Sequence, residues 1–176
     1  MPTGKKKTKA KAKESLSKKT PAPKSSKPKV PLAQRRRARQ LILQALYQWL
    51  IAKAEPQEIE TEFREENAEK PGKVDWEYFH DVFIEIPKQA ASLDEHIHPL
   101  LDRDASALDP VEKALLYLGA FELAHRVDVP YRVVINECVE LAKTFGATES
   151  HKYINGVLDK LARVLRSAER SSHKKK

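Results

Sequence analysis

Residues 109–126 read DPVEKALLYLGAFELAHR and carry the clearest local structural signal in the chain. Asp109 can cap a helix with its carboxylate, Pro110 suits the first helical position, and Glu112 can reach back to the cap amide. The residues behind this start predict a helix that ends at about Arg126.

On the N-terminal side of this helix the apolar residues also recur with helical spacing. From residue 33 onward one face is apolar, and Pro56 breaks the pattern. The residues on that face are Ala38, Leu41, Ile42, Ala45, Leu46, Trp49 and Leu50. The acidic segment 58–69 predicts a weak second helix before the turn at Pro71 and Gly72. An amphipathic stretch starts at Asp75, and Pro87 should kink or end it.

On the C-terminal side two further helices are expected. Pro130 opens the first, whose apolar face runs from Tyr131 to Phe145, and Gly146 should stop it. Thr148 or Ser150 is expected to cap the last helix. No stretch predicts a strand of useful length. The fold class is therefore all-α, with six or seven helices in two small packed bundles.

Length and composition exclude several classes of protein. The chain has 176 residues, of which 40% are hydrophobic and 33% charged, and no apolar run approaches the ~20 residues that cross a bilayer. The basic N-terminus is followed by no apolar segment of a secretory signal. The single cysteine, Cys138, cannot form an intramolecular disulfide. A reducing, cytoplasmic location is expected.

The basic charge is concentrated at the ends of the chain. Residues 1–32 carry eleven lysines and one glutamate, whereas residues 40–173 have a net charge of −9. Residues 1–32 are expected to be a disordered cationic tail, and residues 171–176 a second, shorter one. The helical domain between them covers 33–170, with subdomains of about 33–101 and 102–170. Such segregation favours a polyanionic partner, most often nucleic acid.

A cluster of arginines opens the first helix. Four guanidinium groups there are unfavourable without an anion, because the helix dipole already places partial positive charge at that end. Tyr47 should lie within about 20° of Arg36 on the same helical face. Arginine beside an aromatic ring is typical of single-strand nucleic-acid binding, although a solvated charge run and a core-boundary tyrosine remain alternatives. The cluster consists of Arg35, Arg36, Arg37 and Arg39.

Signatures of catalysis, cofactor binding and metal binding are lacking. The four glycines beyond the tail are too scattered for a phosphate-binding loop. His96 and His98 would point about 200° apart on a helix, so they cannot share a metal there. Cys138 falls on an apolar face and is interpreted as a core residue. Gly156, in the middle of the last helix, is interpreted as a point of close approach by another helix, with Asn155 also structural.

Three segments together resemble one family closely. They are residues 35–48, RRRARQLILQALYQ; residues 129–146, VPYRVVINECVELAKTFG; and residues 150–160, SHKYINGVLDK. The pattern is similar to that of the bacterial transcription antitermination factor NusB family over about residues 33–166.

The resemblance implies an all-helical, non-enzymatic protein without a cofactor. Members of the family pair with ribosomal small-subunit protein ten (NusE). The pair binds the single-stranded boxA element of nascent RNA and helps RNA polymerase to read through terminators, notably in ribosomal RNA operons. By position, the resemblance implies RNA binding by Arg35, Arg36, Arg37, Arg39, Tyr47, Lys152 and Tyr153. It places Glu112 in the helix that faces the ribosomal protein.

Two departures from the family pattern stand out. Tyr153 occupies a position where phenylalanine is more usual, which should preserve stacking, and the lysine-rich tail is not part of the common core. Two alternative functions remain open. One is an RNA-binding module related to ribosomal RNA cytosine methyltransferases, and the other is a purely protein-binding helical adaptor. The sequence leaves the choice between monomer and homodimer open.

Overall fold

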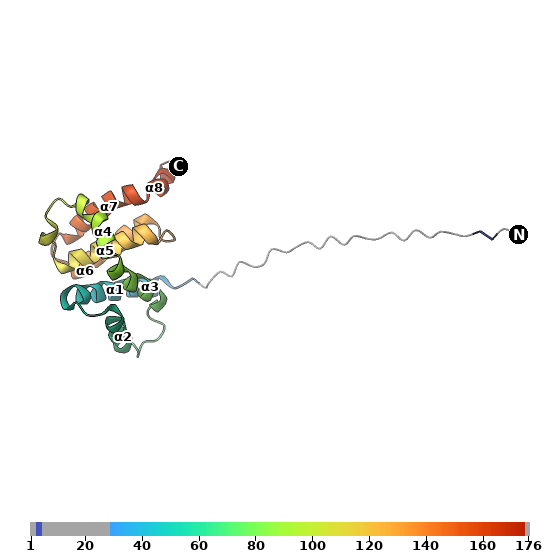
Figure 1. The fold of residues 1–176 in the computed structure, drawn as a ribbon, viewed down its shortest axis with the longest axis horizontal. Coiled ribbons are helices and arrows are strands. Elements are labelled where there is room, and N and C mark those ends of the chain that lie inside the picture. Colours follow the sequence, from blue (N-terminus) through green and yellow to red (C-terminus); the bar gives the residue numbers. More distant parts are fainter. Residues whose placement is uncertain (1–2, 5–28, 175–176) are drawn as a thin grey trace.

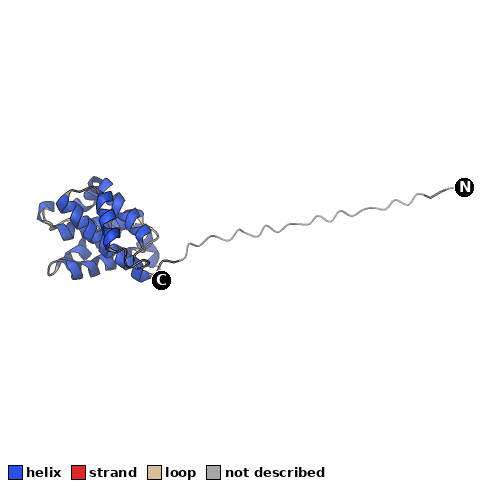
Figure 2. Ribbon diagram, turned by 90° about the horizontal axis from the view of Figure 1, so that it is seen from below, coloured by secondary structure: helices blue, strands red, loops and turns tan. Residues whose placement is uncertain are grey.

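The computed structural model describes residues 3–4 and 29–174, and all regular structure within these residues is helical (Figure 2). Most of the segment predicted to be a disordered tail lies outside the described residues. The helices are α1 (Leu32–Ala52), α2 (Pro56–Glu66), α3 (Trp76–Lys88), α4 (Ala90–Ile97), α5 (Pro110–His125), α6 (Tyr131–Phe145), α7 (Ser150–Leu165) and α8 (Ser167–His173). Two 3-10 turns, η1 (His98–Leu100) and η2 (Ala105–Ala107), connect α4 to α5.

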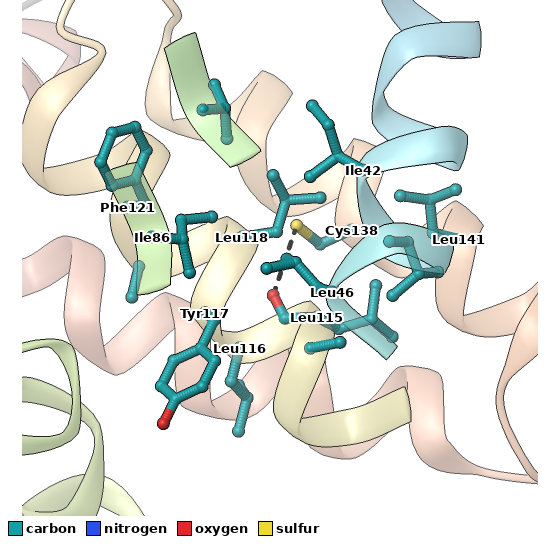
Figure 3. Packing of buried hydrophobic residues seen from close by; sticks show 14 of the residues in the cluster. Ile42, Leu46, Ile86, Leu115, Leu116, Tyr117, Leu118, Phe121, Cys138 and Leu141 are labelled. Atoms are coloured by element: carbon teal, nitrogen blue, oxygen red, sulfur yellow. Dashed lines mark hydrogen bonds between the residues drawn. The ribbon is translucent and has the colours of Figure 1, made fainter. Parts of the chain in front are cut away.

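Helix α5 forms the centre of the fold. Eleven of its sixteen residues are buried, because it is apolar on nearly every side. It contacts α1 and α3 on one side and α4, α6 and α7 on the other, as Figure 1 shows. Its side chains lie among those of α1, α3 and α6 (Figure 3), where the labelled residues are Leu115, Leu116, Tyr117, Leu118, Phe121, Ile42, Leu46, Ile86, Cys138 and Leu141.

The predicted all-α class is confirmed, with eight α-helices in the described residues where six or seven were expected. The additional short helix, α8, continues to His173 and so includes three residues of the predicted C-terminal tail. The subdomain boundary near residue 101 stays a prediction. None of the described helices is both long enough and apolar enough to span a membrane.

Several helices begin or end at the residues that the sequence predicted. Asp109 and Glu112 form the predicted capping box, with Asp109 Oδ1 accepting from the Glu112 amide at 2.8 Å. Pro87 is the last residue but one of α3, and the helix ends there as predicted because proline has no amide to bond the carbonyl of Phe83. Gly146 follows α6 because a Cβ there would come within 2.7 Å of the Ala142 carbonyl oxygen. A glycine is therefore needed for this close approach.

The predicted cap of the last helix is wrong. Glu149 precedes α7 with a left-handed backbone and no side-chain cap. Ser150 Oγ instead donates to Glu112 Oε1 at 3.1 Å, which joins the start of α7 to the start of α5. The Ser150 hydroxyl therefore bonds a residue 38 positions away and does not cap its own helix.

The interpretation of Gly156 is also wrong, and a different glycine has the role assigned to it. A Cβ on Gly119 in α5 would lie 2.7 Å from both terminal carbons of Leu158 and 3.3 Å from Cys138 Sγ. Gly119 therefore permits the close packing of α5 against α6 and α7. Gly156 is exposed, with nothing within 4 Å of a Cβ built there. A glycine inside a helix costs about 1 kcal/mol of stability relative to alanine. No contact within the described part of the protein accounts for that cost at Gly156.

Candidate nucleic-acid interface

The arginines at the start of α1 point in different directions. Arg35 donates to Asp75 Oδ2 at 2.8 Å, and its guanidinium lies 3.9 Å from the centre of the Tyr78 ring. Arg36 donates to Glu137 Oε1 at 3.0 Å, yet its side chain is 55% exposed. Arg37 contacts only the neutral side chains of Gln40 and Asn67 among the described residues. Arg36 and Arg37 therefore keep donors free for a phosphate.

The prediction that Arg39 binds RNA has to be corrected. Its side chain is 2% exposed, and its guanidinium donates three hydrogen bonds to the carboxylate of Glu122 at 2.8 to 3.2 Å. Glu122 is fully buried in α5, so this pair joins α1 to the centre of the fold. Burial raises the pKa of the Glu122 carboxyl, and Arg39 opposes that shift by stabilising the charged form. Arg39 is thus a core residue and offers no donor to RNA.

Tyr47 lies on the same side of α1 as Arg36, as the helical spacing predicted. A groove of about 310 Å³ between α1 and α6 is lined by Arg36, Gln40 and Thr144, among others. An apolar hollow of about 210 Å³ lies further along α1 and is lined by Leu43, Gln44, Tyr47, Val111 and Phe145. Both hollows follow one face of α1, at positions separated by three to four residues.

The second hollow holds two exposed aromatic side chains. Tyr47 is 44% exposed, and Phe145, at the end of α6, is 39% exposed. Exposed aromatic rings beside cationic side chains can stack unpaired bases. Phe145 was expected on the buried face of its helix. It lies at the edge of the core instead, because α6 ends there and nothing covers the ring completely.

Glu112 links this hollow to the start of α7. Its neighbour Val111 lines the hollow, while its own carboxylate accepts from Ser150 and lies 3.8 Å from the Arg103 guanidinium. Glu112 is 6% exposed, and its carboxylate makes its hydrogen bonds to groups inside the protein. It has little surface for direct contact with a partner.

The start of α7 carries the second predicted cluster. Lys152 is exposed and paired with Glu149 on the surface. Tyr153 is half-buried, and the guanidinium of Arg103 lies 3.7 Å from the centre of its ring. Burial raises the pKa of Tyr153, although the Arg103 charge acts in the opposite direction. One face of the predicted stacking platform is therefore covered by an arginine whose side chain remains 40% exposed.

Comparison with known proteins shows the family of the chain. The model of the NusB family matches residues 36–163, which is more than two thirds of the chain. The chain belongs to the NusB family. The transcription antitermination protein NusB of Alcanivorax borkumensis is 56% identical over 147 residues, covering 84% of this chain and 96% of the relative. That of Hahella chejuensis is 50% identical over 145 residues, covering 82% and 96%.

The structures agree as well. The solved structure of T. maritima NusB superimposes with a TM-score of 0.63 at 30% identity, covering 74% of this chain and 91% of that one. The NusB relatives are named as transcription antitermination proteins, a non-enzymatic role, and the prediction that the chain is not an enzyme is confirmed on that ground.

The sequence-based site is thus incomplete within this NusB fold. Arg103 falls in no local motif, and Phe145 belongs to the 129–146 segment but was expected in the core. Their positions beside Tyr153 and Tyr47 depend on helix packing. The described residues contain no group of three or more histidine, cysteine or acidic side chains arranged to hold a metal. The candidate site offers phosphate donors at the start of α1 and aromatic rings in separate hollows beside α1 and α7.

Proposed function

We propose that the chain is a transcription antitermination factor that binds boxA-type single-stranded RNA in nascent transcripts, notably those of ribosomal RNA operons. It acts there with ribosomal small-subunit protein ten (NusE) and promotes read-through by RNA polymerase in the bacterial cytoplasm. The observation that carries the proposal is that exposed Arg36 and the hollow of Tyr47 and Phe145 follow one face of α1. Beside that hollow, Glu112 bonds Ser150 at the start of α7, the helix that bears Lys152 and Tyr153. The names of the relatives support the antitermination role.

The surface suits a single strand better than a duplex. Arg36 and Arg37 can donate forked hydrogen bonds to phosphates, while Tyr47 and Phe145 offer rings to bases that are free to leave a stack. The two cations lie at the start of α1, Tyr47 follows further along that helix, and Phe145 stands beside it at the end of α6. Phosphate contacts supply affinity and base contacts supply sequence preference.

Glu112 has an indirect role in this proposal. Because it fixes both Ser150 and the α5 N-terminus, it shapes the face that the ribosomal protein is proposed to use. We expect Glu112→Gln to weaken the complex with that protein through displacement of α7 rather than through loss of a direct contact.

A titration with boxA-like and scrambled RNA tests the proposal, with and without the ribosomal protein. The Arg36→Ala, Arg37→Ala double variant should bind boxA-like RNA at least tenfold more weakly, about 1.4 kcal/mol, with an unchanged helical circular dichroism spectrum. Its affinity should also depend less steeply on salt, because fewer counterions are released on binding.

The matched control removes two exposed arginines that lie away from this surface. The Arg132→Ala, Arg163→Ala variant has the same net charge as the test variant, but its changes lie on α6 and α7 outside the proposed path. Equal losses of affinity in both variants would show that the effect comes from net charge and not from the positions of Arg36 and Arg37. A wild-type protein with no preference for boxA-like over scrambled RNA would refute the proposal itself.

A further inference from the structure

Arg36 is held by a carboxylate from another helix. Its Nε donates to Glu137 Oε1 at 3.0 Å, which joins the start of α1 to the middle of α6. The Glu137 side chain is only 9% exposed, whereas that of Arg36 is 55% exposed. A carboxylate that is almost buried needs a cation beside it, because an uncompensated charge there is costly. Glu137 therefore fixes Arg36 in the folded protein before any ligand binds.

This hydrogen bond determines which edge of the guanidinium is left for a ligand. A guanidinium has five N–H donors in one plane, one on Nε and two on each Nη. Nε is taken by Glu137, and Arg36 makes no further hydrogen bond to a described residue. The edge formed by Nη1 and Nη2 therefore stays free, and its geometry matches two oxygens of a phosphate.

Neither neighbouring arginine of the exposed cluster is held in this way. Arg35 pairs with Asp75, but its guanidinium lies against the Tyr78 ring and its side chain is only 23% exposed. Arg37 contacts only neutral side chains among the described residues. Of these three arginines, Arg36 alone combines an exposed guanidinium with an almost buried ionic partner.

The groove between α1 and α6 holds a second carboxylate, which allows charge and position to be separated. Glu140, one turn beyond Glu137 on α6, also lines this groove. It pairs with Lys143 at 3.1 Å and not with Arg36. If both carboxylates acted only through their charge, each would oppose the binding of a phosphate.

We infer that Glu137 is a positioning residue for RNA, which holds the Arg36 guanidinium with its Nη edge toward a phosphate of the bound strand. The inference rests on the proposed function and adds to it a residue that acts through Arg36 without touching the ligand. A long side chain that is already fixed loses less entropy on binding, which corresponds to about threefold to tenfold in affinity.

Substitutions of Glu137 test the effect of position. Glu137→Gln and Glu137→Ala both remove the negative charge, but only glutamine keeps an oxygen that can accept from Arg36 Nε. Glu137→Gln should bind boxA-like RNA at least as tightly as the wild-type chain, and Glu137→Ala should bind about threefold to tenfold more weakly than Glu137→Gln. Glu137→Asp keeps the charge but is one methylene shorter, so it should bind more weakly than the wild-type chain. The matched control, Glu140→Ala, removes the same charge from the same groove and should not weaken binding.

A double-mutant cycle shows whether Glu137 acts through Arg36. In the Arg36→Ala background, Glu137→Gln and Glu137→Ala should give equal affinities, because the group that they position is gone. A difference that persists in this background would overturn the inference, since Glu137 would then act through the fold as a whole. Equal affinities of the two variants when Arg36 is present would overturn it as well.

The Arg36 Nε–H proton gives a readout that needs no RNA. Its exchange with water, followed by nuclear magnetic resonance, should be slow in the wild-type chain and in Glu137→Gln and faster in Glu137→Ala. Equal exchange in all three proteins would overturn the inference. Equal binding of boxA-like and scrambled RNA by the wild-type chain would contradict the proposed function and the inference with it, whereas the other outcomes, with that preference intact, overturn the inference alone.

Discussion

Arg103 shows how a single side chain outside every motif can belong to a binding site. Its guanidinium stacks on Tyr153 and lies near Glu112, but its side chain stays 40% exposed and can donate to a phosphate. Arg103→Gln should lower RNA affinity several-fold and reduce the slope of log affinity against log salt by about one. Arg103→Lys should keep the slope but lose part of the affinity, because lysine cannot stack as a plane.

The salt titration of Arg103→Gln needs one control. Arg163→Gln removes an exposed arginine that is paired with Asp159 and lies near the end of α7, at the opposite end from Lys152 and Tyr153. It should leave the slope unchanged. The same slope in Arg103→Gln and wild type would mean that Arg103 supports Tyr153 without touching RNA.

Tyr153 is predicted to act through its ring. Tyr153→Phe should bind RNA within about twofold of wild type, because the stacking surface is kept, whereas Tyr153→Ala should cost ~1–3 kcal/mol of binding free energy. Isothermal titration of both variants with boxA-like RNA measures the difference. Equal losses would show that the hydroxyl group, and not the ring, makes the decisive contact.

The buried pair of Arg39 and Glu122 gives a pH-dependent test of stability. Arg39→Met leaves the Glu122 carboxylate buried without its partner, which should cost about 3–5 kcal/mol. Without Arg39, burial alone raises the folded-state pKa of Glu122 above its unfolded value. The variant should therefore be least destabilised at acid pH, and it should lose stability as pH rises from the unfolded to the folded pKa.

Chemical denaturation of this variant at pH 5 and pH 8 measures the effect. Adding Glu122→Leu should restore much of the stability and remove this pH dependence, because no uncompensated charge is left. A loss of stability in Arg39→Met that is the same at both pH values would show that Glu122 does not titrate in that range.

At the scale of elements, one arginine clamps the C-terminal end of α5. Arg166 is buried and donates to the carbonyl oxygens of Leu123, Val129, Glu122 and Arg126, at 2.7 to 3.1 Å. Two of these carbonyls also accept from a backbone amide at 2.9 Å, that of Glu122 from Arg126 and that of Arg126 from Val129, so Arg166 adds a second donor to each. The contact therefore ties the end of α7 to the connection between α5 and α6.

Arg166→Ala should lower the free energy of unfolding by about 3 kcal/mol or more, because several buried carbonyl oxygens lose a donor. Hydrogen exchange should accelerate most between α5 and α6, while α2, which packs against α1 and α3, stays protected. Uniform acceleration over the whole fold would contradict a local clamp. Arg166→Lys should recover little, since one ammonium cannot reach four carbonyls in this geometry.

At the scale of the whole molecule, the basic tail and the acidic body are expected to act separately. Residues 1–28 have a net charge of +9, whereas Lys29, Val30 and Leu32 belong to the described part and line a cavity of about 520 Å³ beside Tyr78. Deletion of residues 1–28 should weaken binding to boxA-like and scrambled RNA by a similar factor, because phosphate contacts read no bases. The melting temperature should change little.

Two measurements check the tail prediction: the ratio of the two affinities and the thermal unfolding curve. A substantial change in the ratio would mean that the tail contacts a specific site. A melting temperature lower by several degrees would mean that it docks on the folded body.

The amino-acid pattern was enough for the helical class, the capping box at Asp109 and the core position of Cys138. Each of these depends on neighbours within about one helical turn, so local spacing carries the information. The family motifs in residues 35–48 and 150–160 were equally readable, and with them Arg36, Arg37 and Lys152 as exposed cations.

Tertiary packing alone decided the rest. Helical spacing places Arg39 on the face of Ile42 and Leu46, but its partner Glu122 is 83 residues away, so local spacing does not show that a buried carboxylate receives the guanidinium. Gly119 and Gly156 are both helical glycines, yet only the first meets another helix. The physical reason is that a helical pattern shows which face is apolar, whereas the partner of a charged group and the space around a glycine depend on which helices pack together.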